Sequence, residues 1–216
     1  MKALLVIAHP EATAFSRAVL DEVRRGLSEA GAQSEIADLA REGFDPRIQE
    51  ADLAYYRGAG PLPQDVRREQ QRVDQADALI LVFPIYWWSM PALLKGWIDR
   101  VFTIGWAFGP GANGKIEGRL ADKPVRLLAL GADDLAGFQK HGYRAAFAAQ
   151  IEHGIFAFCG LRDLETHLLL SVESRDAAVR SAHLRTAYAV GHAVLRASGA
   201  GSRDNTGKML VDLRDS

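Results

Sequence analysis

The sequence predicts an α/β fold, a doubly wound five-stranded parallel sheet with helices on both faces. Three observations support it. Short apolar runs typical of buried strands alternate with segments of helical periodicity, 216 residues suit one domain, and 48% hydrophobic with 25% charged residues is an ordinary globular composition. We expect one domain over residues 1–197 and a flexible tail over the glycine-rich residues 198–216.

The elements are expected to alternate as strand and helix along the chain. Residues 3–8 form a continuous apolar run, as in a strand covered on both faces of a sheet. Residues 16–30 carry apolar side chains on one helical face, with Ser16 placed to cap the start and Gly31 to end the helix. The other expected strands are 34–39, 78–83, 125–130 and 164–171, and the other expected helices are 63–74, 92–102, 143–158 and 176–197.

Three connections are long for a compact domain, namely 43–62, 103–122 and 131–142. In open parallel sheets, ligands bind beyond the carboxyl ends of the strands. We therefore expect the segments after the first, third and fourth strands to converge on a site.

Composition excludes several classes of function. The 26 Lys and Arg residues against 27 Asp and Glu residues give a formal net charge of −1, so we expect no nucleic-acid partner. The single cysteine, Cys159, cannot form an internal disulfide, which suits a reducing compartment and predicts a cytoplasmic protein. The longest apolar runs are far shorter than the roughly 20 residues of a membrane-spanning helix, so we expect no membrane insertion and no signal peptide.

Residues 9–16, HPEATAFS, lie between a predicted strand and a predicted helix start, where free N–H groups and the helix dipole attract anions. Thr13 and Ser16 add hydroxyl donors. This pattern predicts a phosphate cradle without the glycines of dinucleotide motifs, in the manner of loops that bind flavin mononucleotide. The alternative is that Ser16 only caps the helix and Thr13 faces water.

Residues 83–91 read FPIYWWSMP, so two prolines bracket three adjacent aromatic residues at the carboxyl end of a predicted strand. Proline fixes φ and lacks an N–H donor, which stiffens the loop, while the peptide groups between the prolines remain free to bond a planar heterocycle such as a flavin. For Trp97 and Trp106 we favour a core position. The aromatic run on the loop instead predicts a ligand site.

Four segments are specific enough to compare with a known family: LVIAHP at 5–10, FPIYWW at 83–88, MPALLKGWIDRVF at 90–102 and IFAFCG at 155–160. Together they resemble the NAD(P)H:quinone oxidoreductase family of flavodoxin-like proteins, the group of the DT-diaphorases, over residues 2–197. The resemblance implies a flavodoxin-like fold, a tightly bound flavin, reduction by NAD(P)H and transfer to a small quinone-like acceptor. It also implies a homodimer with active sites at the subunit interface.

The resemblance assigns functional residues by position. The cofactor-binding residues it implies are His9, Thr13, Phe15, Ser16, Pro84, Ile85, Tyr86, Trp87, Ala129, Gly131 and Arg180. Leu130 and Ala132 belong to the same ring-side loop as Gly131. Because Val172 and Arg180 fall where longer members reach toward an adenylate, FAD is favoured, with FMN as the alternative. The residues expected to shape the substrate pocket are Trp88, Trp106, Phe108 and Phe138.

The sequence departs from the family in the loop after the fourth strand. That loop often carries Thr-Thr-Gly-Gly and a tyrosine that partners a histidine, whereas residues 129–141 read ALGADDLAGFQKH. His141 is present and is the expected catalytic donor, since an imidazolium there could stabilise charge developing in the reaction. Tyr143 is expected to be catalytic only if it replaces the missing phenol. The large C-terminal extension of the mammalian enzymes is also missing.

Other motifs predict no chemistry. Residues 109–114 match G-x-G-x-x-G but follow a helix and a loop, so we interpret them as a flexible loop. No paired cysteines or H-E-x-x-H motif suggests a metal site. Cys159 is expected to be inert packing. The remaining histidines singled out, His153, His167, His183 and His192, are expected to be surface or satisfied side chains.

The leading hypothesis is a flavoenzyme that takes hydride from NAD(P)H and then passes two electrons to a quinone, a ping-pong reaction in which azo dyes or nitroaromatics are further possible acceptors. One alternative is a flavin-binding ancillary subunit of a potassium efflux transporter. A one-electron flavodoxin carrier is a third option, less favoured because such carriers are usually strongly acidic.

Overall fold

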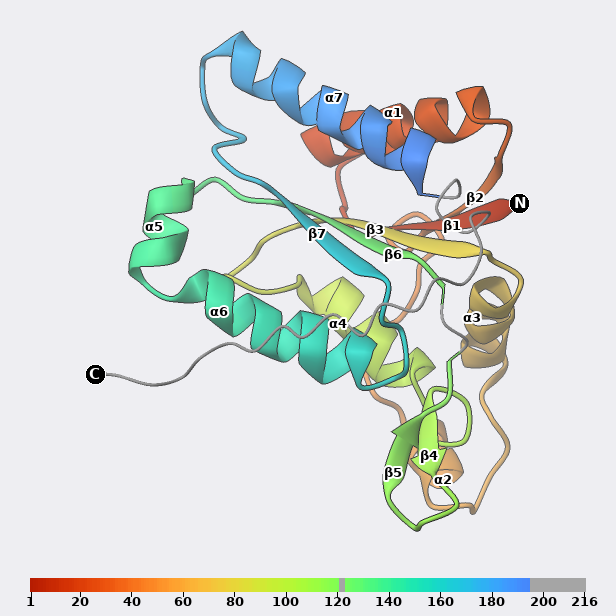
Figure 1. Ribbon diagram of the computed structural model, residues 1–216. Helices are drawn as coiled ribbons and strands as arrows, with labels where there is room; N and C mark the ends of the chain where they lie inside the picture. Colours follow the sequence, from red (N-terminus) through yellow and green to blue (C-terminus); the bar gives the residue numbers. More distant parts are fainter. Residues whose placement is uncertain (121–122, 195–216) are drawn as a thin grey trace.

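The computed structural model describes residues 1–120 and 123–194, and its centre is a five-stranded parallel sheet (Figure 1). Its strands are β1 (Lys2–Ile7), β2 (Gln33–Asp38), β3 (Ala78–Pro84), β6 (Val125–Leu130) and β7 (Leu164–Leu169). They lie in the order β2-β1-β3-β6-β7, and every neighbouring pair is parallel. The predicted doubly wound sheet is confirmed, and the predicted tail over 198–216 lies outside the described residues.

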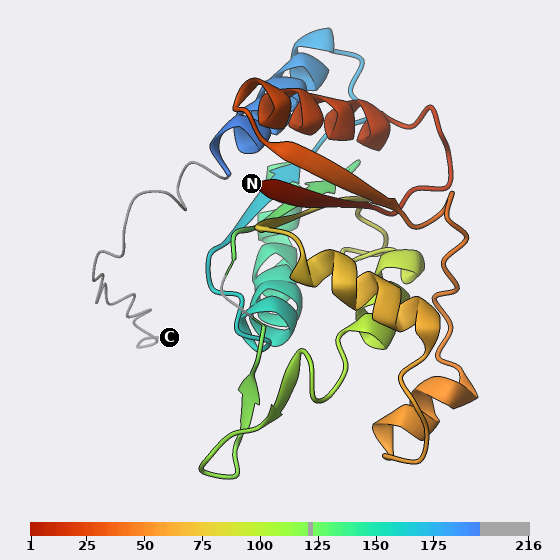
Figure 2. The same cartoon turned by 90° about the vertical axis from the view of Figure 1, so that its right-hand side faces the viewer.

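Helices cover both faces of this sheet. The helices α1 (Phe15–Glu29) and α7 (Ala177–Ala193) lie on one face. On the other face lie α3 (Gln64–Asp74), α4 (Ala92–Val101) and α6 (Tyr143–Phe147), as Figures 1 and 2 show from two sides. The layering is therefore helix, sheet, helix.

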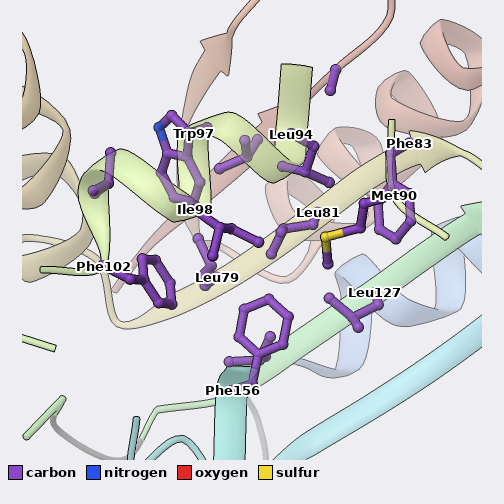
Figure 3. Close-up of a cluster of buried hydrophobic side chains, with 14 of the residues drawn as sticks. Leu79, Leu81, Phe83, Met90, Leu94, Trp97, Ile98, Phe102, Leu127 and Phe156 are labelled. Atoms are coloured by element: carbon purple, nitrogen blue, oxygen red, sulfur yellow. The ribbon is translucent and has the colours of Figure 1, made fainter. Parts of the chain in front are cut away.

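The inner strands β1 and β3 are apolar along nearly their whole length because successive side chains enter two separate cores. In β1, Leu4 and Val6 face the α4 side, whereas Leu5 and Ile7 face α1 and α7. Figure 3 shows the α4-side core, where Trp97 from α4 lies over β3 with its side chain fully buried. The predicted core position of Trp97 is confirmed.

Several predicted boundaries shift by a residue or two, and one shift bears on the site. Helix α1 begins at Phe15 after Ala14, and no side chain caps it. Ser16 lies inside the first turn, so the predicted capping role of Ser16 is wrong. Gly31 follows the end of α1 with φ +78°, the left-handed conformation that the sequence predicted for it.

Two short helices and one π-helix were not predicted. The helices are α2 (Glu50–Tyr56) and α5 (Leu135–Lys140), both within the long connections. The predicted single helix over 143–158 continues beyond α6 as the π-helix η1 (Ala148–Ala157). A Cβ at Gly154 would lie 3.1 Å from the Ala149 carbonyl oxygen, so the missing side chain of Gly154 relieves a tight contact inside this wider helical turn.

The segment that matches G-x-G-x-x-G forms part of a hairpin: residues 109–110 end its first strand, and residues 111–114 belong to the loop that the sequence predicted. Strands β4 (Phe108–Pro110) and β5 (Ile116–Gly118) pair antiparallel. The hairpin packs closely on the end of η1, where a Cβ at Gly118 would lie 2.3 Å from the Cys159 carbonyl carbon. Figure 1 shows the hairpin projecting beyond the sheet.

A buried arginine ties α2 to the body of the protein. The guanidinium of Arg100, on α4, is bonded to both carboxylate oxygens of Asp52 on α2 at 2.8 and 3.2 Å. It also donates to the carboxylate of Asp65 on α3 at 2.7 Å and to the carbonyl of Asp45 at 2.9 Å. Because the Arg100 side chain is only 1% exposed, water cannot replace these partners.

Two glycines allow α1 and α7 to cross in backbone contact. A Cβ at Gly26 would lie 2.2 Å from the Tyr188 carbonyl oxygen, and a Cβ at Gly191 would lie 2.1 Å from the Val23 carbonyl oxygen. Real Cβ atoms do not approach backbone oxygens so closely, so any larger residue at either position must separate the two helices.

We expect Gly191→Ala to lower the free energy of unfolding by about 1–3 kcal/mol, the usual cost of overpacking a closely packed site. The opposing atom belongs to backbone, which cannot move aside as a side chain can. A fall of about 2–10 °C in Tm would follow for a chain of this size. The matched control is Ala189→Ser, at an exposed position on the same helix. Equal Tm values for the two variants would contradict the close crossing.

Within residues 1–120 and 123–194, none of the helices combines the length and the apolar character needed to cross a bilayer.

Candidate flavin site

One pocket, of about 410 Å³, lies at the carboxyl ends of four strands. It is positioned at the switch between β1 and β3, where the chain leaves the sheet in opposite directions. The residues that line it follow β1, β3, β6 and β7: His9, Ala14, Phe15, Ser16, Pro84, Ile85, Tyr86, Leu130, Ala132, Val172 and Glu173. The segments after the first, third and fourth strands of the sheet, β1, β3 and β6, therefore meet, as the sequence predicted.

The loop after β1 presents an unpaired hydroxyl to this pocket. Ser16 is 2% exposed, and its Oγ makes no hydrogen bond with any residue that the structure describes. A buried hydroxyl without a partner is costly, so such groups usually have a ligand or water. Ser16 also lies in the uncapped first turn of α1, where backbone N–H groups favour an anion. These features fit a phosphate group.

The other residues of this loop are arranged differently. The Glu11 backbone N–H donates to Nδ1 of His9 at 3.1 Å, which fixes the imidazole at the pocket wall. Thr13 is exposed, and its hydroxyl donates to the Glu11 carboxylate at 2.9 Å. Thr13 does not line the pocket. Its position agrees with the alternative interpretation, in which Thr13 faces water.

The loop after β3 forms the second wall of the pocket through Pro84, Ile85 and Tyr86. The Ile85 N–H donates to the Leu130 carbonyl at 2.7 Å, which fastens the loop to the end of β6. Tyr86 and Ser89 exchange two backbone hydrogen bonds of 3.1 Å across a two-residue turn formed by Trp87 and Trp88. The turn extends into solvent, and Trp87 is 88% exposed.

The loop after β6 approaches the same pocket through Leu130 and Ala132. Gly131 lies between them, and a Cβ there would lie 2.8 Å from Cδ2 of Leu170, so a larger residue would displace the end of the Leu170 side chain. Ala129, expected in the cofactor site, is fully buried in the core on the α4 side of the sheet. It therefore supports the loop from beneath and offers no surface to a ligand, which corrects that expectation.

A cation packs against Phe15, one of the residues that line the pocket. The Arg180 guanidinium, on α7, lies 4.1 Å from the ring centre of Phe15. Val172 and Glu173 line the pocket beside it and follow Ser171, whose φ of +55° is unusual for a residue with a side chain. Glu173 and Ala14 were not predicted as lining residues, and no sequence pattern distinguishes them.

Four of the predicted residues gather on the far side of the Trp87–Trp88 turn. Trp88 stacks on Tyr143 with ring centres 4.2 Å apart and planes inclined by 23°. Tyr143 lies 5.5 Å from the His141 ring and meets Phe138 edge to face at 5.9 Å. Phe138 is 1% exposed, so its expected place in the substrate pocket is corrected to a buried support. His141 is exposed, at the end of α5.

Trp106 and Phe108 do not join this group within one chain. Trp106 is half-buried, packs on Phe102 and donates through Nε1 to the Asp74 carboxylate at 3.0 Å. Phe108 lines a second cavity of about 160 Å³, between α2 and the end of α4. Both residues follow α4 away from the carboxyl ends of the strands, so the substrate pocket expected from them is not formed by the single chain.

Most of the residues expected to be inert have ordinary surroundings, but Nε2 of His167 is buried without a hydrogen-bond partner among the described residues. Burial raises the pKa of the Cys159 thiol to about 11, which disfavours the reactive thiolate. His183 bonds the Leu170 carbonyl at 2.7 Å, His192 stacks on Tyr188, and His153 is exposed on η1. Burial lowers the pKa of His167, which favours its neutral form.

The part of the chain that the structure describes contains no group of three or more His, Cys, Asp or Glu residues placed to hold a metal ion. The donors at the pocket are instead hydroxyl, imidazole and backbone groups. They suit an organic anion joined to a flat, largely apolar body.

Comparison with protein families gives a match to the family described as having a flavodoxin-like fold, over residues 1–190. An uncharacterised NAD(P)H oxidoreductase of Haemophilus influenzae is 28% identical over 188 residues, which cover 87% of this chain and 92% of that protein. The mouse ribosyldihydronicotinamide dehydrogenase [quinone] is 32% identical over 197 residues, with coverage of 80% and 82%.

Among solved structures, the NAD(P)H:quinone oxidoreductase from Methanothermobacter marburgensis is similar over 89% of this chain and 98% of its own, with a TM-score of 0.82 and 28% sequence identity.

Proposed function

The chain belongs to the NAD(P)H:quinone oxidoreductase family of flavodoxin-like proteins, and on this basis we propose that it is a flavin-dependent enzyme that transfers two electrons from NAD(P)H to a small quinone-like acceptor. Donor and acceptor would use the same pocket in turn, which is a ping-pong mechanism. Azo and nitroaromatic compounds are further candidate acceptors.

The observation that carries this proposal is the unpaired hydroxyl of Ser16 in a pocket that lies between the polar loop after β1 and the apolar loop after β3. Ser16 and the first N–H groups of α1 would hold the flavin phosphate, with His9 and Phe15 beside them. Pro84, Ile85, Tyr86 and Gly131 would frame the flavin ring. When bound, the flavin supplies the two-electron redox chemistry, and the chain supplies grip, orientation and an open ring face.

We favour FAD over FMN because Val172 and Glu173, after β7, line the pocket together with the residues of the phosphate loop. The Arg180 guanidinium lies over the ring of Phe15, another lining residue. A planar adenine could pack there, and a guanidinium suits the second phosphate of a dinucleotide. Acid extraction of the flavin from purified protein, followed by chromatography against FAD and FMN, distinguishes the two.

We also propose a homodimer. Trp106 and Phe108 lie away from the pocket of their own chain, so a role in shaping a substrate pocket would require them to reach the pocket of a second copy. Ile116 of the hairpin and Phe158, which packs on Phe108 of the hairpin, are exposed in the single chain and would be covered in the homodimer. A light-scattering mass near that of one chain at micromolar concentration would contradict the homodimer. The buried, free Cys159 suits our proposal of a cytoplasmic setting.

The proposed activity is tested on one preparation. We expect absorbance in the flavin bands after reconstitution with FAD, and turnover of NADH or NADPH with a simple benzoquinone at a rate typical of enzymes, on the order of 1–1000 per second. A protein that stays colourless after addition of both FAD and FMN would exclude the flavoenzyme. Flavin binding with negligible turnover would instead favour the ancillary subunit of a transporter.

Ser16→Ala is expected to weaken flavin binding by about tenfold to a hundredfold, because a hydrogen bond to a charged group contributes about 1.5–3 kcal/mol. Titration of the apoprotein with FAD, followed by fluorescence quenching, measures the change in Kd. Without flavin, the variant should be no less stable than wild type, since the lost hydroxyl has no partner within the described residues.

The matched control is Ser28→Ala, an exposed serine near the other end of α1. It should leave the Kd unchanged. If both variants bind FAD like wild type, the phosphate is not held at Ser16.

A further inference from the structure

Trp87 and Trp88 occupy a backbone conformation that suits neither of them. Their φ angles are +50° and +58°, and with the two hydrogen bonds between Tyr86 and Ser89 they form a two-residue hairpin turn with the φ signature of type I′. Such turns need positive φ at both central positions and strongly favour Asn-Gly. Two adjacent tryptophans are therefore strained there.

Packing does not account for Trp87. Its side chain is 88% exposed, so it gains little from burial while it carries the backbone strain. The non-glycine residues with positive φ in residues 1–120 and 123–194 are Trp87, Trp88 and Ser171. Trp87 follows Tyr86 and Ser171 precedes Val172, both of which line the pocket, and Trp88 completes the same turn as Trp87. Strain that collects at a pocket indicates that the conformation serves a ligand.

The turn is held from one side by a stack of rings. The Trp88 indole lies face to face with Tyr143. Tyr143 in turn rests edge-on against Phe138, the buried residue of α5. Trp87 packs edge to face on Trp88 at 5.9 Å. Phe138 therefore anchors Tyr143, Tyr143 holds Trp88, and Trp88 supports Trp87.

We propose that Tyr143 is a positioning residue whose ring latches the strained Trp87–Trp88 turn, and that the latched turn presents the Trp87 indole as a platform for flat, fused-ring aromatic acceptors. The platform rests on the proposed quinone reductase function, whereas the latch does not. The role of the Tyr143 ring is separate from any role of its hydroxyl group, so the two can be measured apart.

The first test removes the strain. In the apoprotein, Trp87→Gly should raise Tm by about 2–4 °C, because glycine adopts positive φ freely and little buried surface is lost. In the flavin-loaded protein, the same change should raise the KM for a naphthoquinone by about twofold to tenfold, and the KM for a single-ring benzoquinone by less. An unchanged or lowered Tm, or an equal rise in both KM values, would overturn the platform.

The second test removes the latch. Tyr143→Ala should increase quenching of tryptophan emission by acrylamide in the apoprotein and raise the KM for the naphthoquinone. Tyr143→Phe keeps the ring and should restore the wild-type values of both. The control is Tyr56→Ala, which removes an exposed tyrosine from α2 and should leave the quenching unchanged. If Phe and Ala at position 143 behave alike, the latch is wrong.

The two failures are distinguishable. Normal turnover with no change in quenching in Tyr143→Ala would overturn the latch and leave the proposed function intact. The expected quenching in a protein that binds no flavin would support the latch and exclude the proposed function.

Discussion

His141→Ala is expected to slow electron transfer by roughly tenfold to a thousandfold while flavin binding and Tm stay at wild-type values. The reason is that removal of one hydrogen-bond donor to developing charge costs about 2–4 kcal/mol of transition-state stabilisation. His141 is exposed at the end of α5, beside Tyr143 and outside the core, so its loss leaves the phosphate loop and the Pro84 loop in place. Rapid-mixing measurements of the half-reaction with NAD(P)H and of that with quinone give the effect directly.

Two further variants show whether the slowing is specific to His141 and whether Tyr143 takes part in it. His153→Ala removes an exposed histidine on η1 and should leave both half-reactions unchanged. Tyr143→Phe removes only the hydroxyl; if that phenol works with His141, both single variants are slow and the double variant is little slower than either. If His141→Ala shows wild-type rates in both half-reactions, His141 does not stabilise the developing charge, and the pocket acts only by positioning the reactants.

Arg100→Met is expected to lower the free energy of unfolding by about 3–5 kcal/mol, the usual cost of removing one partner from a buried ion pair. The substitution leaves the Asp52 carboxylate, which is 10% exposed, without its cation, and it also frees Asp65 and the carbonyl of Asp45. Helix α2 loses its tether to α4. Urea denaturation of the wild type and the variant measures the difference.

An ion pair on the surface of the same helix provides the control. Lys95 and Asp99 are 2.6 Å apart, with side chains 50% and 41% exposed, so Lys95→Met should cost less than about 1 kcal/mol. Adding Asp52→Leu to Arg100→Met should recover part of the loss, because no unpaired carboxylate then remains on α2. Similar costs for the Arg100 and Lys95 variants would show that the buried pair does not hold α2.

The large elements of the fold could be predicted because their sequences carry strong local signals. The strands β1 and β3 are nearly continuous apolar runs, β6 is interrupted only by Arg126, and the structure buries both faces of all three strands. Helix α2 carries no comparable signal: it has no buried residue and depends on Arg100, which is distant in sequence. Helix α5 had a readable start in Asp134, which accepts a hydrogen bond from the Gly137 N–H, but its six residues are too few for a periodic pattern.

For the site, the sequence indicated which loops would meet but not how each side chain would point. His9, Phe15, Ser16 and the Pro84 loop line one pocket, as their places after parallel strands suggested. Ser16 was ambiguous, since a hydroxyl near a helix start suits both a cap and a ligand, and only the helix start at Phe15 removes the capping role. Ala129 and Phe138 could not be placed, because which face of a strand or helix enters the core depends on packing partners.

The contact between α1 and α7 has a consequence for how the protein is made. These are the first and the last helices that the structure describes, and their glycines meet across almost the whole length of the chain. On the ribosome, α1 and the strands beneath it emerge before Ala187 and Val190 of α7, which follow all five strands of the sheet. Until α7 emerges, one face of the sheet lacks half of its cover. A nascent chain that stalls before α7 should therefore depend on chaperones and aggregate without them, although its whole sheet has already been translated.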